Sequence, residues 1–281
     1  MHFLNRLSVA LLFVLCGFCA HGQILVTGGS DPLDADSVKR DFSNQPYFGL
    51  YKDNYFIFGP SVGSRPTRDN TNIKFQVSIS QRLTRSTLPW GTYLYLFYTQ
   101  KCFWNILENS MPMTDLNFNP GIGITKPLFV KNRYIGKVTF LVEHESNGRD
   151  STESRSWNRV ALAANVMVTK NLMVHGKIWV PIVDGMHNKD IVDYCGFWQA
   201  GFQVLSDNKR FMGGVTIAKR KGWNLNANVT VDFAYRIFKQ DNQYLYLQFY
   251  NGYGEGLLAY NRFHSQIRVG LLIRPKLFSD Y

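Results

Sequence analysis

The chain has 281 residues, and its 31 Lys and Arg against 20 Asp and Glu give a net charge of +11. This length suits one large β-barrel or one to two ordinary domains. A positive surplus can serve nucleic-acid binding, but the chain begins like an exported protein, which rarely meets nucleic acid. We therefore exclude nucleic acid as a partner and assign the charge to anionic lipid head groups or to an Arg-lined lumen.

The first 22 residues resemble a secretory signal peptide. Residues 1–6 carry one positive charge, residues 7–19 are apolar but too short to span a bilayer, and Ala20 and Gly22 place small residues before a cleavage site. We expect cleavage before Gln23 and an irregular lead-in over residues 23–48. A buried N-terminal helix is the alternative. The mature chain would then lie beyond the inner membrane.

Two cysteines, Cys102 and Cys195, remain after cleavage, and the sequence does not decide whether they pair. No stretch after residue 22 is apolar for 18 residues, so we expect no transmembrane helix in the mature chain. Aromatic residues make up 15% of the chain. A soluble protein could carry that load, and so could a membrane barrel with aromatic girdles.

Apolar and polar residues alternate over much of the chain, which predicts β-strands. The pattern is clearest in residues 72–82, 224–236 and 266–274, where the polar positions include full charges. An apolar face and a strongly polar face over about ten residues are typical of a transmembrane barrel strand. A soluble barrel would also alternate, with its apolar face inward.

Nine more segments show strand character, giving an even total of twelve. They are residues 50–59, 92–104, 116–128, 134–147, 156–168, 172–182, 195–205, 209–219 and 241–256. Bacterial single-chain barrels have even strand numbers. We therefore predict an all-β fold, a single transmembrane antiparallel up-and-down β-barrel of about 12 strands over residues 49–281.

Three polar residues interrupt the apolar faces of two neighbouring strands. His144 and Ser146 share the apolar face of strand 134–147, and Asn158 shares that of strand 156–168. Polar groups in lipid are costly unless they bond to one another. A Ser-His-Asn chain would remove that cost and supply a nucleophile, a base and an orienting group. The alternative is that they simply lie in the interfacial zone.

The segment from His144 to Arg159, HESNGRDSTESRSWNR, resembles the active-site hairpin of outer membrane phospholipase A. Two other stretches are similar to the same family and occur in its order: YTQK at 98–101, and YNGYGE at 250–255. The resemblance covers roughly residues 50–281. It implies a calcium-dependent homodimeric phospholipase in the bacterial outer membrane, acting on membrane phospholipids.

By motif position, the resemblance implies that Ser146 is the nucleophile, His144 its general base and Asn158 the residue that orients the imidazole. The backbone N–H of Gly148 would face the oxyanion. Glu145 lies between His144 and Ser146 but should point into the lumen.

Calcium would be held by the carbonyls of Arg149 and Ser154 and by a seryl oxygen of the partner subunit, for which Ser110 is the nearest match. The loop around Ser110 is less serine-rich than the family pattern. Gln100 matches the family's polar dimer contact.

The resemblance predicts hydrolysis of acyl esters in glycerophospholipids and lysophospholipids, at both acyl positions. Two other functions stay open at this point. A passive outer-membrane pore or structural barrel would conduct ions without esterase activity, and an exported lipid-binding barrel would be extracted without detergent.

Overall fold

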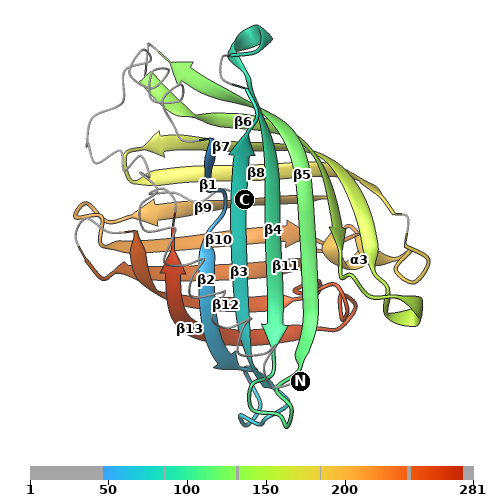
Figure 1. The fold of residues 1–281 in the computed structure, drawn as a ribbon. Coiled ribbons are helices and arrows are strands. Elements are labelled where there is room, and N and C mark those ends of the chain that lie inside the picture. Colours follow the sequence, from blue (N-terminus) through green and yellow to red (C-terminus); the bar gives the residue numbers. More distant parts are fainter. Residues whose placement is uncertain (1–46, 85–86, 131–132, 184, 239–241, 275–281) are drawn as a thin grey trace.

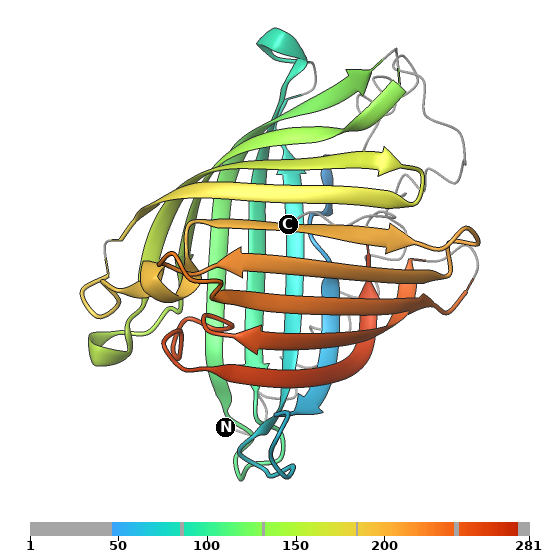
Figure 2. The same ribbon diagram turned by 180° about the vertical axis from the view of Figure 1, so that it is seen from behind.

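The computed structural model describes residues 47–84, 87–130, 133–183, 185–238 and 242–274. The predicted signal peptide and most of the predicted lead-in fall outside them. The described chain forms one closed antiparallel β-barrel in which sequential strands are neighbours (Figure 1). Figure 2, seen from behind, shows the later strands, β8 to β13, side by side along the wall that lies at the back in Figure 1.

Thirteen strands are resolved in the described residues. They are β1 (Phe48–Leu50), β2 (Asn54–Pro60), β3 (Thr71–Arg82), β4 (Tyr93–Trp104), β5 (Met113–Val130), β6 (Arg133–Ser146), β7 (Ser156–Thr169), β8 (Leu172–Ile182), β9 (Trp198–Leu205), β10 (Phe211–Lys219), β11 (Ala227–Arg236), β12 (Gln243–Gly252) and β13 (His264–Ile273). Pairing of β2 with β13 and of β3 with β4 closes the ring.

The thirteen strands occupy twelve positions around the barrel, because β1 and β2 are two pieces of one strand. Both pair with the same edge of β3: β2 pairs with residues 71–76 and β1 with residues 79–81. The opposite edge of β3 is taken by β4. The predicted twelve-stranded antiparallel barrel is therefore confirmed.

Side chains replace backbone hydrogen bonds where the first strand is interrupted between β1 and β2. The Asn54 side chain accepts a hydrogen bond from the Ser78 N–H at 2.6 Å and donates to the Ser78 carbonyl at 3.2 Å. Asp53 turns into the lumen and accepts hydrogen bonds from Arg274, among them one from Nε at 3.0 Å and one from Nη2 at 2.6 Å. The break thus leaves few backbone groups unsatisfied and ties the first strand to the end of the last.

The outer surface of the barrel is apolar. Side chains alternate across each strand, so residues such as Phe140, Val142 and Val180 point outward and are 48%, 45% and 66% exposed. A water-soluble monomer rarely carries so continuous an apolar band, whereas a transmembrane barrel requires one. Within the described residues, no helix has the length and apolarity needed to span a bilayer.

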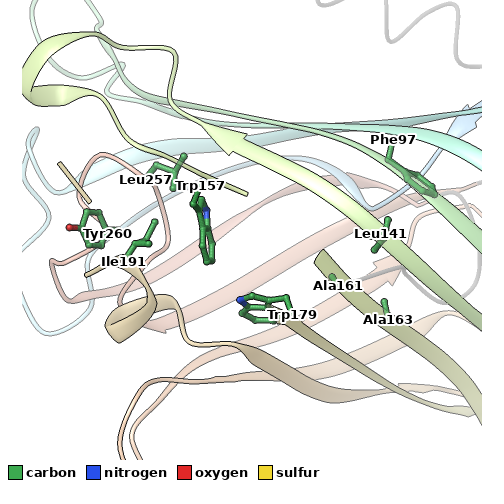
Figure 3. Packing of buried hydrophobic residues seen from close by; sticks show 9 residues of the cluster. All are labelled: Phe97, Leu141, Trp157, Ala161, Ala163, Trp179, Ile191, Leu257 and Tyr260. Carbon is green, nitrogen blue, oxygen red and sulfur yellow. The ribbon is translucent and has the colours of Figure 1, made fainter. Parts of the chain in front are cut away.

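Side chains occupy much of the lumen, although a cavity of about 250 Å³ remains. At one end, Trp157, Trp179, Leu257 and Tyr260 pack together with Ile191 of the short helix α3 (Ile191–Cys195) (Figure 3). The loops that follow β2, β4, β6, β8, β10 and β12 all emerge at this end. Cys102 and Cys195 are both free thiols.

Glu255 connects the loop after β12 to two strands of the lumen wall. Its carboxylate accepts hydrogen bonds from Arg268 Nη1 at 2.6 Å, Arg268 Nη2 at 3.2 Å and Lys74 Nζ at 3.2 Å. Burial alone would raise the pKa of Glu255, but the Lys74 and Arg268 charges outweigh it and lower that pKa to about 2. Glu255 therefore belongs to a network of ion pairs in the lumen, a role that the sequence did not single out.

This depressed pKa predicts an acid-dependent loss of stability. Glu255 stabilises the fold fully above the ordinary glutamate pKa of 4.5, and this contribution is lost as the pH falls towards 2. Glu255→Gln should therefore lower the free energy of unfolding at neutral pH by about 3 kcal/mol, since it leaves two buried cations unpaired. Urea unfolding in lipid vesicles should show the gap to wild type narrowing as the pH drops.

The control is Glu153→Gln, because Glu153 is 58% exposed and its partner Arg149 is also at the surface. That change should have little effect at any pH. A constant gap between Glu255→Gln and wild type from neutral to acidic pH would contradict the assignment.

Candidate active site

A hairpin of β6 and β7 carries the polar residues that interrupt the apolar exterior. In its register His144 lies directly opposite Asn158, and Ser146 lies opposite Ser156. His144 Nδ1 and Asn158 Oδ1 are 2.8 Å apart, a hydrogen-bonding distance. Both side chains lie on the outer face, in line with the exposed Val142.

Ser146 shares this face two residues beyond His144, at the end of β6 that leads into the β6–β7 loop. In the described chain no direct hydrogen bond joins Ser146 to His144, so the structure holds the His–Asn pair together and places the serine next to it. Ser146 also belongs to a row of residues across neighbouring strands, in which Gln100 lies opposite Phe118 and Phe118 lies opposite Ser146. Phe118 therefore separates the predicted dimer contact from the predicted nucleophile.

The inner face of the same hairpin is locked by ion pairs. Glu143 lies opposite Arg159, one step before the His144–Asn158 pair. The Arg159 guanidinium is 3.1 Å from Glu143 Oε1 and 3.0 Å from Glu145 Oε2, and it stacks 4.3 Å from the Trp157 ring centre. Glu145 points into the lumen, as expected. These contacts fix the register of β6 against β7 from inside.

The loop after Ser146 is organised by one buried side chain. Asn147, only 2% exposed, accepts a hydrogen bond from the Arg155 N–H at 2.9 Å and donates to the Glu153 carbonyl at 2.7 Å. Gly148 follows with φ +63°, a conformation that favours glycine. A Cβ at Gly148 would lie 2.9 Å from the Phe118 ring, so the turn packs closely on β5.

The residues predicted to bind calcium all lie at this end of the barrel. Arg149 donates to the Thr114 carbonyl at 2.7 Å, which fastens the β6–β7 loop to the start of β5. The Ser154 carbonyl accepts a hydrogen bond from Arg155 Nη1 at 2.9 Å. Ser110 is exposed in the turn between β4 and β5, with φ +69°. Across the described residues no cluster of three or more His, Cys, Asp or Glu side chains could hold a metal.

Three residues that support the hairpin were not predicted from the sequence. Asn119 donates to the His144 carbonyl at 2.6 Å. Asn188, fully buried in the β8–β9 loop, pairs with both backbone groups of Ser156, at 3.2 Å to the N–H and 2.8 Å to the carbonyl. The third residue is Phe118, whose ring packs against Gly148. Asparagines in polar loops and one aromatic in an alternating strand carry no distinguishing sequence signal.

Comparison with known proteins shows which family has this sequence. The family model for phospholipase A1 matches residues 47–273. A phospholipase A1 of Proteus vulgaris is 31% identical over 242 residues, which are 79% of this chain and 78% of that protein.

Solved structures of outer membrane phospholipases share the fold of this chain. Outer membrane phospholipase A from Escherichia coli superimposes with a TM-score of 0.70 at 26% identity, covering 82% of this chain and 99% of that one. The Salmonella typhi outer membrane phospholipase dimer with bound calcium gives 0.71 at 25% identity, covering 86% and 98%.

A closed barrel with an apolar exterior and this degree of likeness defines an outer-membrane β-barrel hydrolase of acyl esters. More particularly, the chain belongs to the phospholipase A1 family.

The turn at Gly148 generates a stability prediction. Gly148→Ala forces a side chain into a left-handed conformation, at about 1–2 kcal/mol, and pushes against Phe118. The free energy of unfolding in vesicles should fall by at least that amount. Gly176→Ala is the matched control, because a Cβ there would meet only a carbonyl oxygen at 3.8 Å and φ is ordinary. Equal effects of the two changes would contradict this view of the turn.

Proposed function

We propose that this outer-membrane phospholipase cleaves acyl esters with Ser146 as nucleophile, His144 as general base and Asn158 as the residue that orients His144. Its substrates would be glycerophospholipids and lysophospholipids, cut at either acyl position. The observation that carries the proposal is the 2.8 Å His144–Asn158 hydrogen bond on the hydrocarbon-facing surface, with Ser146 on the same face.

The Asn158 amide oxygen can only accept a hydrogen bond, so Nδ1 of His144 carries the proton. That tautomer leaves Nε2 free to take the proton of Ser146 as its oxygen attacks the ester carbonyl. Asn158 is neutral and stabilises the resulting imidazolium less than a carboxylate would. On the inner face, Glu145 is paired with Arg159, so it leaves the outer triad undisturbed.

The reaction would proceed through a seryl ester. The Ser146 Oγ–carbon bond forms, the lysolipid alkoxide leaves, and it takes up the proton held by His144. Water then attacks the seryl ester and gives a proton to His144, the Ser146 Oγ–carbon bond breaks to release the fatty acid, and His144 returns that proton to Ser146 Oγ. The backbone N–H of Gly148, in the turn directly after the strand, would donate to the oxyanion.

Calcium is the cofactor we propose for this site. Main-chain carbonyls of Arg149 and Ser154 are hard oxygen donors of the kind calcium prefers, and both belong to the loop that follows Ser146. The donor types therefore fit, although the Arg155 guanidinium would have to leave the Ser154 carbonyl. When bound, calcium would polarise water at the oxyanion position and offset the charge that forms there.

We also propose that the active form is a homodimer. Gln100 lies on the outer face of β4, where it accepts a hydrogen bond from the Tyr98 hydroxyl at 3.1 Å. Pairing two barrels over this face would bring Ser110 of the partner subunit to the calcium loop. The similarity to a Salmonella typhi enzyme whose structure is a calcium-bound dimer supports both proposals. A monomer would lack that ligand and be nearly inactive, which protects the membrane.

The nucleophile assignment predicts that Ser146→Ala abolishes phospholipid hydrolysis, with a loss of about 10⁴-fold or more in kcat. The barrel should stay folded and heat-modifiable on gels, because Ser146 has no lumen contacts. Ser156→Ala, at the position paired with Ser146, is the matched control and should keep most activity. Full activity in Ser146→Ala would refute the assignment, and channel conductance without any esterase activity would favour a passive pore.

The metal assignment predicts that EDTA suppresses turnover and that added calcium restores it. Calcium should also raise the dimer fraction seen by chemical cross-linking, because the two subunits share the ligand set. Ser110→Ala should weaken both responses to calcium. Turnover that is indifferent to chelation would remove calcium from the proposal.

A further inference from the structure

A polar cavity of about 250 Å³ lies in the lumen immediately behind the active-site hairpin. It lies against the inner side of β6 and β7, where Glu145, Trp157 and Arg159 line it together with Trp179 of β8. Trp157 and Trp179 belong to the packed cluster drawn in Figure 3. One water takes up about 30 Å³ in the liquid, so the space is large enough for a solute with several waters.

Cations outnumber anions around this cavity. Lys52, Lys101, Arg159 and Lys177 line it, against Glu145 in the wall and Glu143 just beneath. Arg159 pairs with both glutamates, and Lys177 Nζ lies 2.5 Å from Glu143. Within the described ranges, neither Lys52 nor Lys101 has a carboxylate partner. These two lysines therefore give the cavity a net positive charge, because Glu143 and Glu145 act on them only from beyond ion-pair distance.

Asn117, one of the residues that line the cavity, has an amide nitrogen that is unpaired among the described residues. Asn117 lies opposite Lys101 on the inner face of β5 and is only 2% exposed. Its Oδ1 accepts a hydrogen bond from the Leu257 N–H at 3.1 Å, while its Nδ2 has no partner in the part of the chain that the structure describes. A buried donor without an acceptor is costly, and a ligand oxygen would satisfy it.

We infer that this cavity is a binding site for a soluble oxyanion of the phosphate class. Two ammonium groups match the charge of a phosphate dianion, and lysine binds phosphate as a point charge. The Asn117 amide, whose Nδ2 is covered in the empty barrel, would add a hydrogen bond after a small rotation of the side chain. Intact membrane lipids reach only the outside of the barrel, so the ligand would be free phosphate or a small phosphate ester. The inference does not depend on the triad assignments.

Isothermal titration calorimetry on the detergent-folded full chain tests this site. Inorganic phosphate is titrated at constant ionic strength with EDTA present, so that neither calcium nor general screening contributes. One saturable site per chain is expected, with no such signal for chloride. Glycerol phosphate in a parallel titration separates a site that accepts phosphate esters from one that accepts only the free ion.

Asn117→Asp is the sharpest variant, because it keeps the acceptor for Leu257 and replaces the unpaired donor with a negative charge. Phosphate affinity should fall at least tenfold, and Lys101→Gln should give a loss of similar size. Lys170→Gln is the control, since Lys170 is 66% exposed in the turn between β7 and β8, at the other end of the barrel. It should bind phosphate as wild type does.

Two results would overturn the inference. The first is the absence of saturable phosphate binding to the wild-type barrel. The second is unchanged binding by a folded Asn117→Asp barrel. Should Lys101→Gln fail to fold, the wild-type titration and Asn117→Asp still decide the question.

Discussion

The register between β6 and β7 is the constraint on which the site depends. Because side chains alternate across a strand, a slip of one residue would move His144 and Ser146 into the lumen and bring Glu145 out into lipid. The Glu143–Arg159–Glu145 cluster prevents this from inside the barrel, where its charges are shielded from lipid. The lumen network is thus a structural device that fixes the geometry of an external site.

Lipid-facing polar groups impose a second constraint. His144 and Asn158 can occupy the apolar exterior because each satisfies the other, and Ser146 lies at the loop-bearing end of the strand, where water is near. The surrounding wall supports them from both sides: Asn119 holds the His144 backbone, and Asn188 holds the backbone of Ser156. The site is consequently built on rigid strands, with only the Gly148 turn and the following loop outside them.

Much of this arrangement could be predicted from the sequence. Alternation located the strands to within a few residues, as for β3 and β8, because an apolar exterior and a polar lumen impose a strict period of two. The pairing of His144 with Asn158 followed from one hairpin. What could not be predicted depends on contacts between distant segments. The break at Asp53 looks like ordinary strand sequence, and its partner is Arg274, 221 positions later.

The same reason explains the missed lumen residues. Glu255 lies in a glycine-rich loop, and only the folded barrel shows that this loop turns inward to meet Lys74 and Arg268. Asn117 looks like any polar residue of an alternating strand, and its unpaired amide is visible only once the cavity is formed. Local periodicity specifies faces and strands, whereas closure of the ring decides which inward residues meet.

Treatment of the purified enzyme with a serine-directed sulfonyl fluoride, followed by peptide mapping, tests most directly whether an activated serine stands on the membrane-facing wall. Inactivation should run in parallel with modification of Ser146 and of no other serine, and His144→Ala should be labelled far more slowly. Inactivation accompanied by labelling at a different serine, with Ser146 unmodified, would contradict this account.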